Sequence, residues 1–381
     1  MKILVTGANG FVGKNLIETL KNIKDGKDKT KPNLNIEEIY ECTRETTDEE
    51  LKEYTKNCDF VYHLAGVNRP EKIEEFMEGN YEFTNKLLDN LLLNNNKCPV
   101  MISSSIQAEL DNDYGKSKKA GEDLLFNYSK ENNVNVYVYR LPNLFGKWCK
   151  PNYNSVIATF CYNIANDLDI TVNDENKELT LAYIDDVIDE ILKCLTNEAT
   201  NDGNFYKVPV THTVTLGEIV KLLNEFKESR NNLLIPNMEV TSFSKKLYST
   251  YLSYLPTDKF SYPVKMNVDD RGSFTELFKS LDRGQVSVNV AHPGITKGNH
   301  WHHTKNEKFV VVSGEGLIQF RKVGESDIIE YRVSGEKIEV VDIPTGYTHN
   351  IINVGDTDLV TVMWCNEIFN PDKPDTYFEE V

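Results

Sequence analysis

The chain has 381 residues, of which 40% are hydrophobic, so it is long enough to bury two cores. Its 42 basic and 59 acidic residues give a net charge of −17, which argues against a nucleic-acid partner. Seven cysteines without a Cys-x-x-Cys pair indicate reduced thiols in a reducing compartment. A glycine motif beginning at Gly7 leaves no room for a signal peptide, and no apolar run reaches membrane length. We therefore expect a cytoplasmic protein that binds neither nucleic acid nor membranes.

The first predicted strand and helix are joined by a glycine-rich turn. Residues 2–6 form a short β-type run, and Gly-Ala-Asn-Gly-Phe-Val-Gly follows and opens an apolar-periodic helix. Glycines in such a turn let a pyrophosphate approach the backbone at the positive end of the helix. The Gly-x-x-Gly-x-x-Gly spacing is a weak signal by itself. The candidate cofactor-binding residues of this turn are Gly7, Asn9, Gly10, Phe11, Val12 and Gly13.

A tyrosine and a lysine lie four residues apart on a later predicted helix. Tyr114 and Lys118 share one helix face, and a nearby ammonium favours the phenolate. Such a phenol can give or take the proton of a carbonyl or an alcohol while a nicotinamide moves hydride. The serine run 103–105 lies upstream, after an apolar strand, and a serine hydroxyl there would polarise the same oxygen. A chance Tyr-x-x-x-Lys is usually a solvated pair, but its place in this βα pattern favours catalysis.

Residues 1–226 resemble the extended short-chain dehydrogenase/reductase family, which works on nucleotide sugars. The resemblance implies a catalytic set of Ser105, Tyr114 and Lys118, with Lys118 also contacting the cofactor. It further implies that Leu64, Ala65 and Gly66, at the end of the third strand, contact the cofactor. The matching segments are the glycine turn, Asp59–Gly66, Asn80 with Thr84-Asn85, the serine run, Tyr114 with Lys118, Arg140–Gly146 and Leu181–Asp186.

The end of the second predicted strand, Ile-Tyr-Glu-Cys-Thr-Arg, indicates which cofactor is preferred. Family members that prefer NAD carry an acid there, which holds the ribose 2′-hydroxyl. If the alternation is kept, the diagnostic position is Thr43, and Arg44 follows it. A guanidinium suits a 2′-phosphate, so NADPH is expected. A register slip of two would place Glu41 there and reverse the preference.

The pattern of predicted elements changes along the chain. Strands alternating with helices to about residue 150 indicate an α/β Rossmann fold with a doubly wound parallel sheet. Helices follow to about residue 226 and are expected to form a sugar-nucleotide lobe, whereas short strands after residue 262 predict an all-β barrel. We expect a reductase domain over residues 1–255 and a barrel domain over 256–381. The loop 147–155 is either a diphosphate or uridine contact or a buried connection.

Histidines gather in the predicted barrel, where five of the seven lie after residue 290. His300 and His302 are two residues apart, so their imidazoles leave the same face of a strand. Glu307 follows five residues later, and His349 lies further along the chain. Imidazole and carboxylate are ligands that Zn²⁺, Fe²⁺, Mn²⁺ and Ni²⁺ accept. These four residues therefore predict a divalent metal site, with zinc favoured, although the histidines could instead simply cover a sheet face.

The spacing of these residues resembles the cupin family, which has a jelly-roll barrel. The first half of the cupin pattern fits from Gly294 to Gly314, and in the second half Ile338 replaces an expected glycine. The segment Asp269–Glu276 resembles the 4-keto-6-deoxy sugar nucleotide epimerases. That resemblance implies a catalytic base at His300 and a substrate-binding residue at Lys297. His300 therefore has two competing roles, metal ligand or base.

Together, the two halves resemble the bifunctional capsular polysaccharide enzymes of the pathway to UDP-N-acetyl-L-fucosamine. The resemblance implies a homodimer whose substrate is a UDP-4-keto-6-deoxy-HexNAc, UDP-2-acetamido-2,6-dideoxy-hexos-4-ulose. The barrel would epimerise C3, and the Rossmann domain would reduce the C4 ketone with NADPH to UDP-2-acetamido-2,6-dideoxy-L-talose. The alternatives are a dehydrogenase fused to a metal-dependent oxygenase and a non-catalytic NADP- and sugar-binding sensor. The Asp-x-Arg-Gly segment argues against the first, and the intact catalytic set argues against the second.

Overall fold

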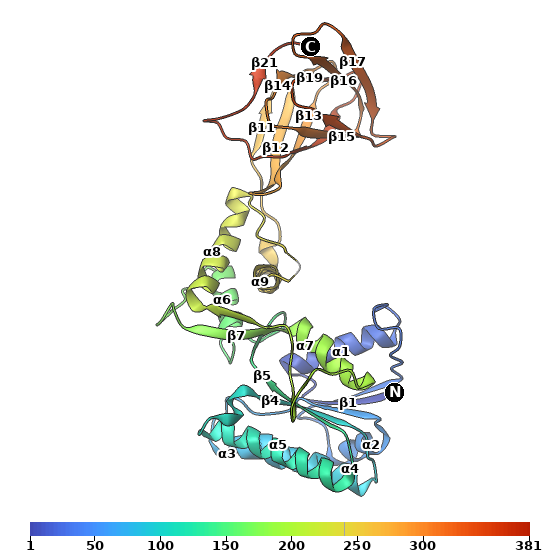
Figure 1. The fold of residues 1–381 in the computed structure, drawn as a ribbon, viewed down its shortest axis with the longest axis vertical. Helices are drawn as coiled ribbons and strands as arrows, with labels where there is room; N and C mark the ends of the chain where they lie inside the picture. Colours follow the sequence, from blue (N-terminus) through green and yellow to red (C-terminus); the bar gives the residue numbers. More distant parts are fainter. Residues whose placement is uncertain (240) are drawn as a thin grey trace. The chain divides into compact units, whose positions relative to one another are not determined.

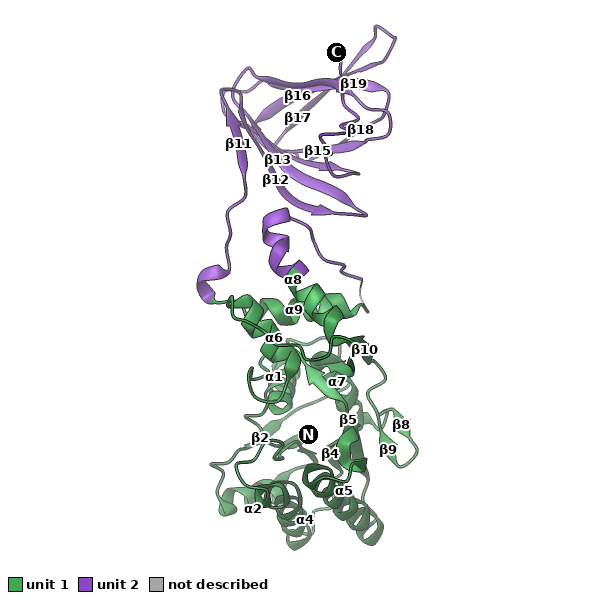
Figure 2. Cartoon of the chain, turned by 90° about the vertical axis from the view of Figure 1, so that its left-hand side faces the viewer, with its two compact units in different colours: residues 1–224, 241–256 green, residues 225–240, 257–381 purple. Residues whose placement is uncertain are grey.

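The computed structural model describes residues 1–239 and 241–381. The chain divides into two compact units, of which one comprises residues 1–224 and 241–256 (Figure 2). The other comprises residues 225–240 and 257–381. Among the described residues, no helix combines the length and the apolar character needed to cross a membrane.

The first unit is built on a seven-stranded sheet that is parallel except at one edge. Adjacent residues of β1 enter different cores: Ile3 and Val5 pack against α1 and α7 on one face, and Leu4 packs against α2, α4 and α5 on the other (Figure 1). This two-faced burial explains the nearly continuous apolar strands, and the predicted doubly wound sheet is confirmed. In spatial order the strands are β2 (Glu38–Cys42), β1 (Lys2–Thr6), β3 (Phe60–His63), β4 (Val100–Ser105), β5 (Val136–Leu141), β9 (Phe205–Tyr206) and β8 (Asn201–Asp202).

Helices cover both faces of this sheet, and a small second sheet follows it in the chain. The covering helices are α1 (Phe11–Lys24), α2 (Asp48–Asn57), α4 (Phe83–Leu93), α5 (Asp113–Asn132) and α7 (Ile184–Leu192). Between β3 and α4, α3 (Glu74–Met77) continues into a π-helix, Glu78–Glu82. The second sheet has the order β10 (His212–Thr215), β7 (Glu178–Tyr183) and β6 (Asn143–Phe145), and the later helices are α6 (Val156–Ala165), α8 (Leu216–Asn232) and α9 (Phe243–Leu252).

The strand order places a switch point between β1 and β3. The chain leaves β1 to form β2 on one side and returns to form β3 on the other. In open α/β sheets, ligands bind at the carboxyl ends of the strands beside such a point. The turn after Thr6 and the loop after His63 therefore face each other at this edge, since the register pairs these two residues.

The second unit consists of two antiparallel sheets around one apolar core, as a jelly roll requires. Phe309, Ile318, Ile351 and Leu359 are buried in that core, and the predicted all-β barrel is confirmed. One sheet has the order β11 (Met266–Asp269), β12 (Gly272–Ser280), β13 (Gly284–Ala291), β20 (Leu359–Cys365), β15 (Glu307–Ser313) and β18 (Val340–Ile343). The other has the order β17 (Ile328–Ser334), β16 (Glu315–Lys322), β19 (Tyr347–Asn353), β14 (Thr296–Trp301) and β21 (Tyr377–Phe378).

Candidate functional site

The glycine turn is held tightly against the loop after β3. Gly7 has φ +71°, and a Cβ there would lie 2.7 Å from the backbone nitrogen of Ala65. At Gly13 a Cβ would lie 2.2 Å from the carbonyl oxygen of Gly7. Gly10 caps α1 without any side-chain hydrogen bond, so backbone N–H groups remain available at the positive helix end, as pyrophosphate binding requires. Asn9 is exposed beside them, while Phe11 and Val12 pack on the core.

A buried histidine, which was not among the candidate site residues, supports this turn. Nδ1 of His63 lies 2.7 Å from Oγ1 of Thr6, and Nε2 lies 2.8 Å from Oγ1 of Thr84. The Thr6 hydroxyl also accepts a hydrogen bond from the backbone of Ala65. Burial lowers the pKa of His63 to about 3, so its ring is neutral. The histidine therefore joins β1, β3 and α4 and holds Leu64, Ala65 and Gly66 beside the glycine turn.

The structure brings Ser105, Tyr114 and Lys118 together. Ser105 ends β4, while Tyr114 lies in the first turn of α5 and is hydrogen-bonded to the Ser105 side chain. Nζ of Lys118 donates to the carbonyl oxygen of Ser103 at 3.1 Å. A Cβ at Gly66 would lie 2.9 Å from that Nζ. The lysine thus lies between the serine run and the loop expected to contact the cofactor.

The protonation of this set differs from the expectation that Lys118 favours the phenolate. Burial raises the pKa of Tyr114, and the hydrogen bond with Ser105 offsets this only in part. Burial also lowers the pKa of Lys118 to about 8. Tyr114 is therefore a protonated phenol at neutral pH, which is the form that can donate a proton.

A buried ion pair beneath the serine run was not predicted. Glu122 is only 1% exposed and lies one helical turn after Lys118. It accepts a hydrogen bond from Ser104, and Arg140 on β5 binds both of its oxygens at 2.9 and 2.7 Å. This network ties α5 to β4 and β5, and the Glu122 charge raises the pKa of Lys118 against the effect of burial. The spacing Lys-x-x-x-Glu was the available sequence signal.

The end of β2 lies beside the glycine turn, since the backbone nitrogen of Ala8 donates to the carbonyl oxygen of Cys42. Thr43 and Arg44 follow this residue directly, and the Arg44 side chain is exposed. Glu41 is still within the strand and pairs with Lys21 of α1 at 2.9 Å. Glu41, the carboxylate that would bind the ribose 2′-hydroxyl if the register slipped, is therefore already paired with Lys21.

The loop 147–155 lines an open polar cavity of about 660 Å³ in the same unit. Asn152, Tyr153 and Ser155 line it together with Arg69, which comes from the segment after β3. Arg69 donates a hydrogen bond to the carbonyl oxygen of Tyr153. Nearby, Trp148 is 46% exposed, and the ammonium of Lys14 lies 4.8 Å from its ring centroid. The loop is therefore exposed or half-buried throughout and is not a buried connection.

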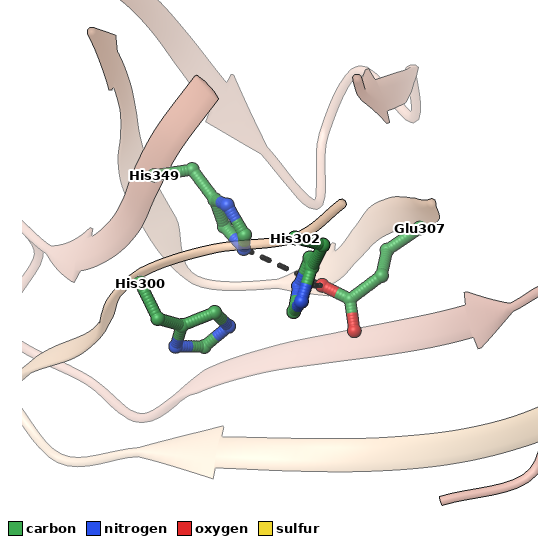
Figure 3. A group of neighbouring side chains, drawn as sticks. All are labelled: His300, His302, Glu307 and His349. Atoms are coloured by element: carbon green, nitrogen blue, oxygen red, sulfur yellow. Dashed lines mark ion pairs between the residues drawn. The ribbon is translucent and has the colours of Figure 1, made fainter. Parts of the chain in front are cut away.

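In the barrel unit, four side chains from three neighbouring segments converge (Figure 3). His300 on β14 is paired with His349 on β19, His302 follows β14, and Glu307 begins β15. One potential ligand atom from each residue lies within 4.8 Å of the others. Oε2 of Glu307 lies 3.4 Å from Nε2 of His349 and 3.6 Å from Nε2 of His302.

The donor atoms of this cluster fit a divalent cation. Nε2 of His302, Nε2 of His349 and Oε2 of Glu307 are buried, and no hydrogen bond from the described residues satisfies any of them. Such atoms are costly unless a cation or another partner faces them. His300 is partly exposed, and burial lowers its pKa to about 4, so it is neutral and able to bind a metal. Three imidazoles and one carboxylate are ligands suited to zinc, and also to iron or manganese.

Lys297, which the epimerase resemblance assigns to substrate binding, lies on the same strand as His300. Its Nζ donates to Oδ1 of Asn289 at 3.0 Å and to the carbonyl oxygens of Val290 and Ser273 at 2.8 and 3.4 Å. Burial lowers the pKa of Lys297. Its ammonium is therefore already held by three oxygens of the barrel wall.

Comparison with known proteins covers both units. Residues 3–208 match the NAD dependent epimerase/dehydratase family, and residues 267–377 match the polysaccharide biosynthesis C-terminal domain. The chain is 44% identical over 377 residues to the UDP-2-acetamido-2,6-beta-L-arabino-hexul-4-ose reductase of Pseudomonas aeruginosa, covering 99% of this chain and 98% of that one.

Solved structures agree with this assignment. The capsular polysaccharide assembling protein CapF from Staphylococcus aureus is 57% identical, with a TM-score of 0.92 and complete coverage of both chains. The UDP-glucuronic acid 4-epimerase from Bacillus cereus, solved with NAD, is 20% identical, with a TM-score of 0.52 over 67% of this chain and 96% of that one, and it shows the fold alone. The predicted resemblance to capsular polysaccharide enzymes is thus confirmed. The chain belongs to the NAD dependent epimerase/dehydratase family and carries a polysaccharide biosynthesis domain after its dehydrogenase half.

Proposed function

We propose that this chain is a bifunctional enzyme acting on one UDP-4-keto sugar. Residues 1–255 reduce the C4 ketone, and residues 256–381 epimerise C3. The observation that carries the proposal is a complete Ser105–Tyr114–Lys118 set in one unit and a buried metal-donor set in the other. End-to-end similarity to a UDP-2-acetamido-hexul-4-ose reductase supports the substrate class, UDP-2-acetamido-2,6-dideoxy-hexos-4-ulose.

The reduction needs a proton donor at the C4 oxygen, and the chain's own residues supply it. NADPH, when bound, supplies the hydride to C4. The raised pKa of Tyr114 keeps the phenol protonated, so it can give its proton to the oxygen as the carbonyl becomes an alcohol. Ser105 orients that phenol through their hydrogen bond. Once the proton has left, the ammonium of Lys118 stabilises the Tyr114 phenolate. The product would be UDP-2-acetamido-2,6-dideoxy-L-talose.

The cavity beside the loop 147–155 is proposed to hold the UDP portion of the substrate. It offers the guanidinium of Arg69 for the diphosphate and amide side chains such as Asn152 for the uracil. Because the cavity and Tyr114 belong to the same unit, UDP bound in the cavity would leave the C4 ketone of the attached sugar free to approach Tyr114.

The epimerisation depends on the acidity of the proton at C3, next to the C4 ketone. A base removes this proton, the charge moves to the C4 oxygen, and the proton returns on the opposite face. A divalent metal, with zinc favoured, would be held by His302, Glu307 and His349, and its positive charge would stabilise that oxygen. His300 has two candidate roles, because its neutral imidazole can either complete the ligand set or remove the proton.

We also propose that the chain forms a homodimer through the barrel unit. Strands β17 and β18 and their connection expose a group of large apolar side chains that a single copy leaves in water. These are Ile328, Ile329, Tyr331, Ile338 and Val340, each at least 45% exposed.

The first prediction concerns the proton donor of the reductase. Tyr114→Phe keeps the ring but removes the hydroxyl, so NADPH should still bind while its oxidation by the keto-sugar falls ~10²–10⁴-fold. Absorbance at the nicotinamide band measures turnover, and fluorescence titration measures binding. Tyr128→Phe on the same helix is the matched control, and its turnover should stay near wild type. Wild-type turnover in Tyr114→Phe would remove Tyr114 from the mechanism.

The second prediction concerns the choice of cofactor. Arg44→Ala should raise the KM for NADPH far more than the KM for NADH, because only NADPH carries a 2′-phosphate. Lys56→Ala, an exposed cation on the neighbouring α2, controls for a general loss of positive charge. An equal loss for both cofactors would contradict the assignment and favour Glu41 as the determinant.

The third prediction is that the two activities are separable. His302→Ala should lose bound metal and the exchange of the C3 proton with D₂O, but should still reduce a 4-keto sugar supplied with the product's C3 configuration. Tyr114→Phe should show the reverse. Metal analysis, NMR and NADPH oxidation measure these outcomes, and His292→Ala, a surface histidine of the same unit, is the control.

The role of His300 follows from the same measurements. Metal retained with exchange abolished in His300→Ala would make His300 the base, whereas metal lost would make it a ligand. Wild-type C3 exchange in metal-free His302→Ala would show that the exchange does not need the metal. C3 exchange that persists in a chain ending before Tyr262 would contradict the division of labour between the two units.

A further inference from the structure

The end of the chain is bound along the strand that leads into the metal-donor cluster. Strand β21 pairs with β14, so that Phe378 lies opposite His300 and Tyr377 opposite Trp301 (Figure 1). The backbone nitrogen of Glu379 donates to the carbonyl oxygen of Asn299 at 3.0 Å, and its carboxylate pairs with Arg321 at 2.8 Å. This anchoring fixes the segment just before β21, which contains Asp375.

The carboxylate of Asp375 binds the turn between His302 and Glu307. Oδ1 accepts a hydrogen bond from the backbone nitrogen of His303 at 3.0 Å. Oδ2 accepts three more, from the backbone nitrogen and hydroxyl of Thr304 at 2.9 and 3.0 Å and from the backbone nitrogen of Lys305 at 2.9 Å. The Asp375 side chain therefore binds three consecutive residues, 303–305, in the connection between the metal-donor residues His302 and Glu307.

The backbone of the same aspartate holds the outer nitrogen of His302. Nδ1 of His302 lies 2.6 Å from the carbonyl oxygen of Asp375. A carbonyl oxygen can only accept, so Nδ1 carries the proton, and the lone pair of Nε2 faces Glu307. By contrast, Nδ1 of His349 lies 3.5 Å from the carbonyl oxygen of Tyr347. Among the metal-donor residues, His302 thus has its tautomer and ring orientation fixed by the carbonyl oxygen of Asp375.

We propose that Asp375 is a positioning residue for the metal centre. The Asp375 carboxylate binds the turn after His302. This contact keeps the carbonyl oxygen of Asp375 at Nδ1 of His302. Loss of a group that orients a metal ligand in this way commonly weakens metal binding about 10–100-fold. The inference rests on the proposed metal site. It adds Asp375, which lies more than 65 positions after Glu307 in the chain but contacts the turn between His302 and Glu307.

A metal titration tests this role without any measurement of catalysis. Purified full-length chains, stripped of metal, are titrated with Zn²⁺ against a chromophoric chelator. Asp375→Ala should bind Zn²⁺ about 10–100-fold more weakly than wild type. Asp375→Asn, which keeps one acceptor oxygen, should fall between the two. Asp372→Ala, an exposed carboxylate in the same terminal segment, should match wild type.

Two further readouts separate positioning from simple anchoring of the tail. The visible spectrum of the Co²⁺-loaded protein should change in Asp375→Ala, because the geometry of an imidazole ligand changes. The unfolding temperature of the metal-free protein should fall less than that of the Zn²⁺-loaded protein.

The outcomes are distinguishable from those of the proposed function. Wild-type Zn²⁺ affinity and an unchanged Co²⁺ spectrum in Asp375→Ala would overturn the positioning role while leaving the metal site intact. If Asp375→Ala does not fold, the same result in Asp375→Asn overturns it. If the wild-type chain binds no Zn²⁺ at the cluster, the metal site fails and this inference fails with it.

Discussion

Three buried donor atoms, for which the described part of the chain offers no hydrogen bond, are the constraint on which the barrel unit depends. They belong to His302, Glu307 and His349, and they meet beside an apolar core that includes Phe309 and Ile351. A protein interior does not tolerate such atoms without compensation, and a cation compensates all three at once. The pairing of β14 with β19, and the position of Glu307 at the start of β15 in the other sheet, bring the atoms together. If a metal occupies this site, as we propose, the stability of the unit should depend on it.

The dehydrogenase unit handles buried polar groups differently. Glu122 is balanced within the chain by Arg140 and Ser104, and His63 is held between two threonine hydroxyls. These groups are satisfied by the chain itself, so the positions of Ser105 and Lys118 are fixed without an ion. Burial then sets the protonation of the site, since it raises the pKa of Tyr114 and keeps the phenol protonated.

The sequence predicted those features that are encoded locally. The glycine turn, the Tyr114–Lys118 spacing and the His-x-His pattern each lie within a few residues, and the strand and helix patterns indicated both fold classes. The contacts that were missed join distant segments: His63 to Thr84, Glu122 to Arg140, and Asp375 to the turn after His302. Spacing also could not reveal burial, which raises the pKa of Tyr114 although a neighbouring ammonium alone would lower it. For the same reason the three oxygens around Lys297 became visible only in the folded barrel.

In the function proposed above, the two units act on adjacent carbons of one sugar by different chemistry. Isotopic labelling of a UDP-4-keto-6-deoxy-HexNAc tests it directly, because solvent and cofactor deliver hydrogen to different positions. We predict deuterium at C3 from D₂O whether or not NADPH is present. With 4-deuterated NADPH in ordinary water, we predict deuterium at C4 alone. Label at C3 that requires NADPH, or no label at C3 under any condition, would contradict the proposed division of labour.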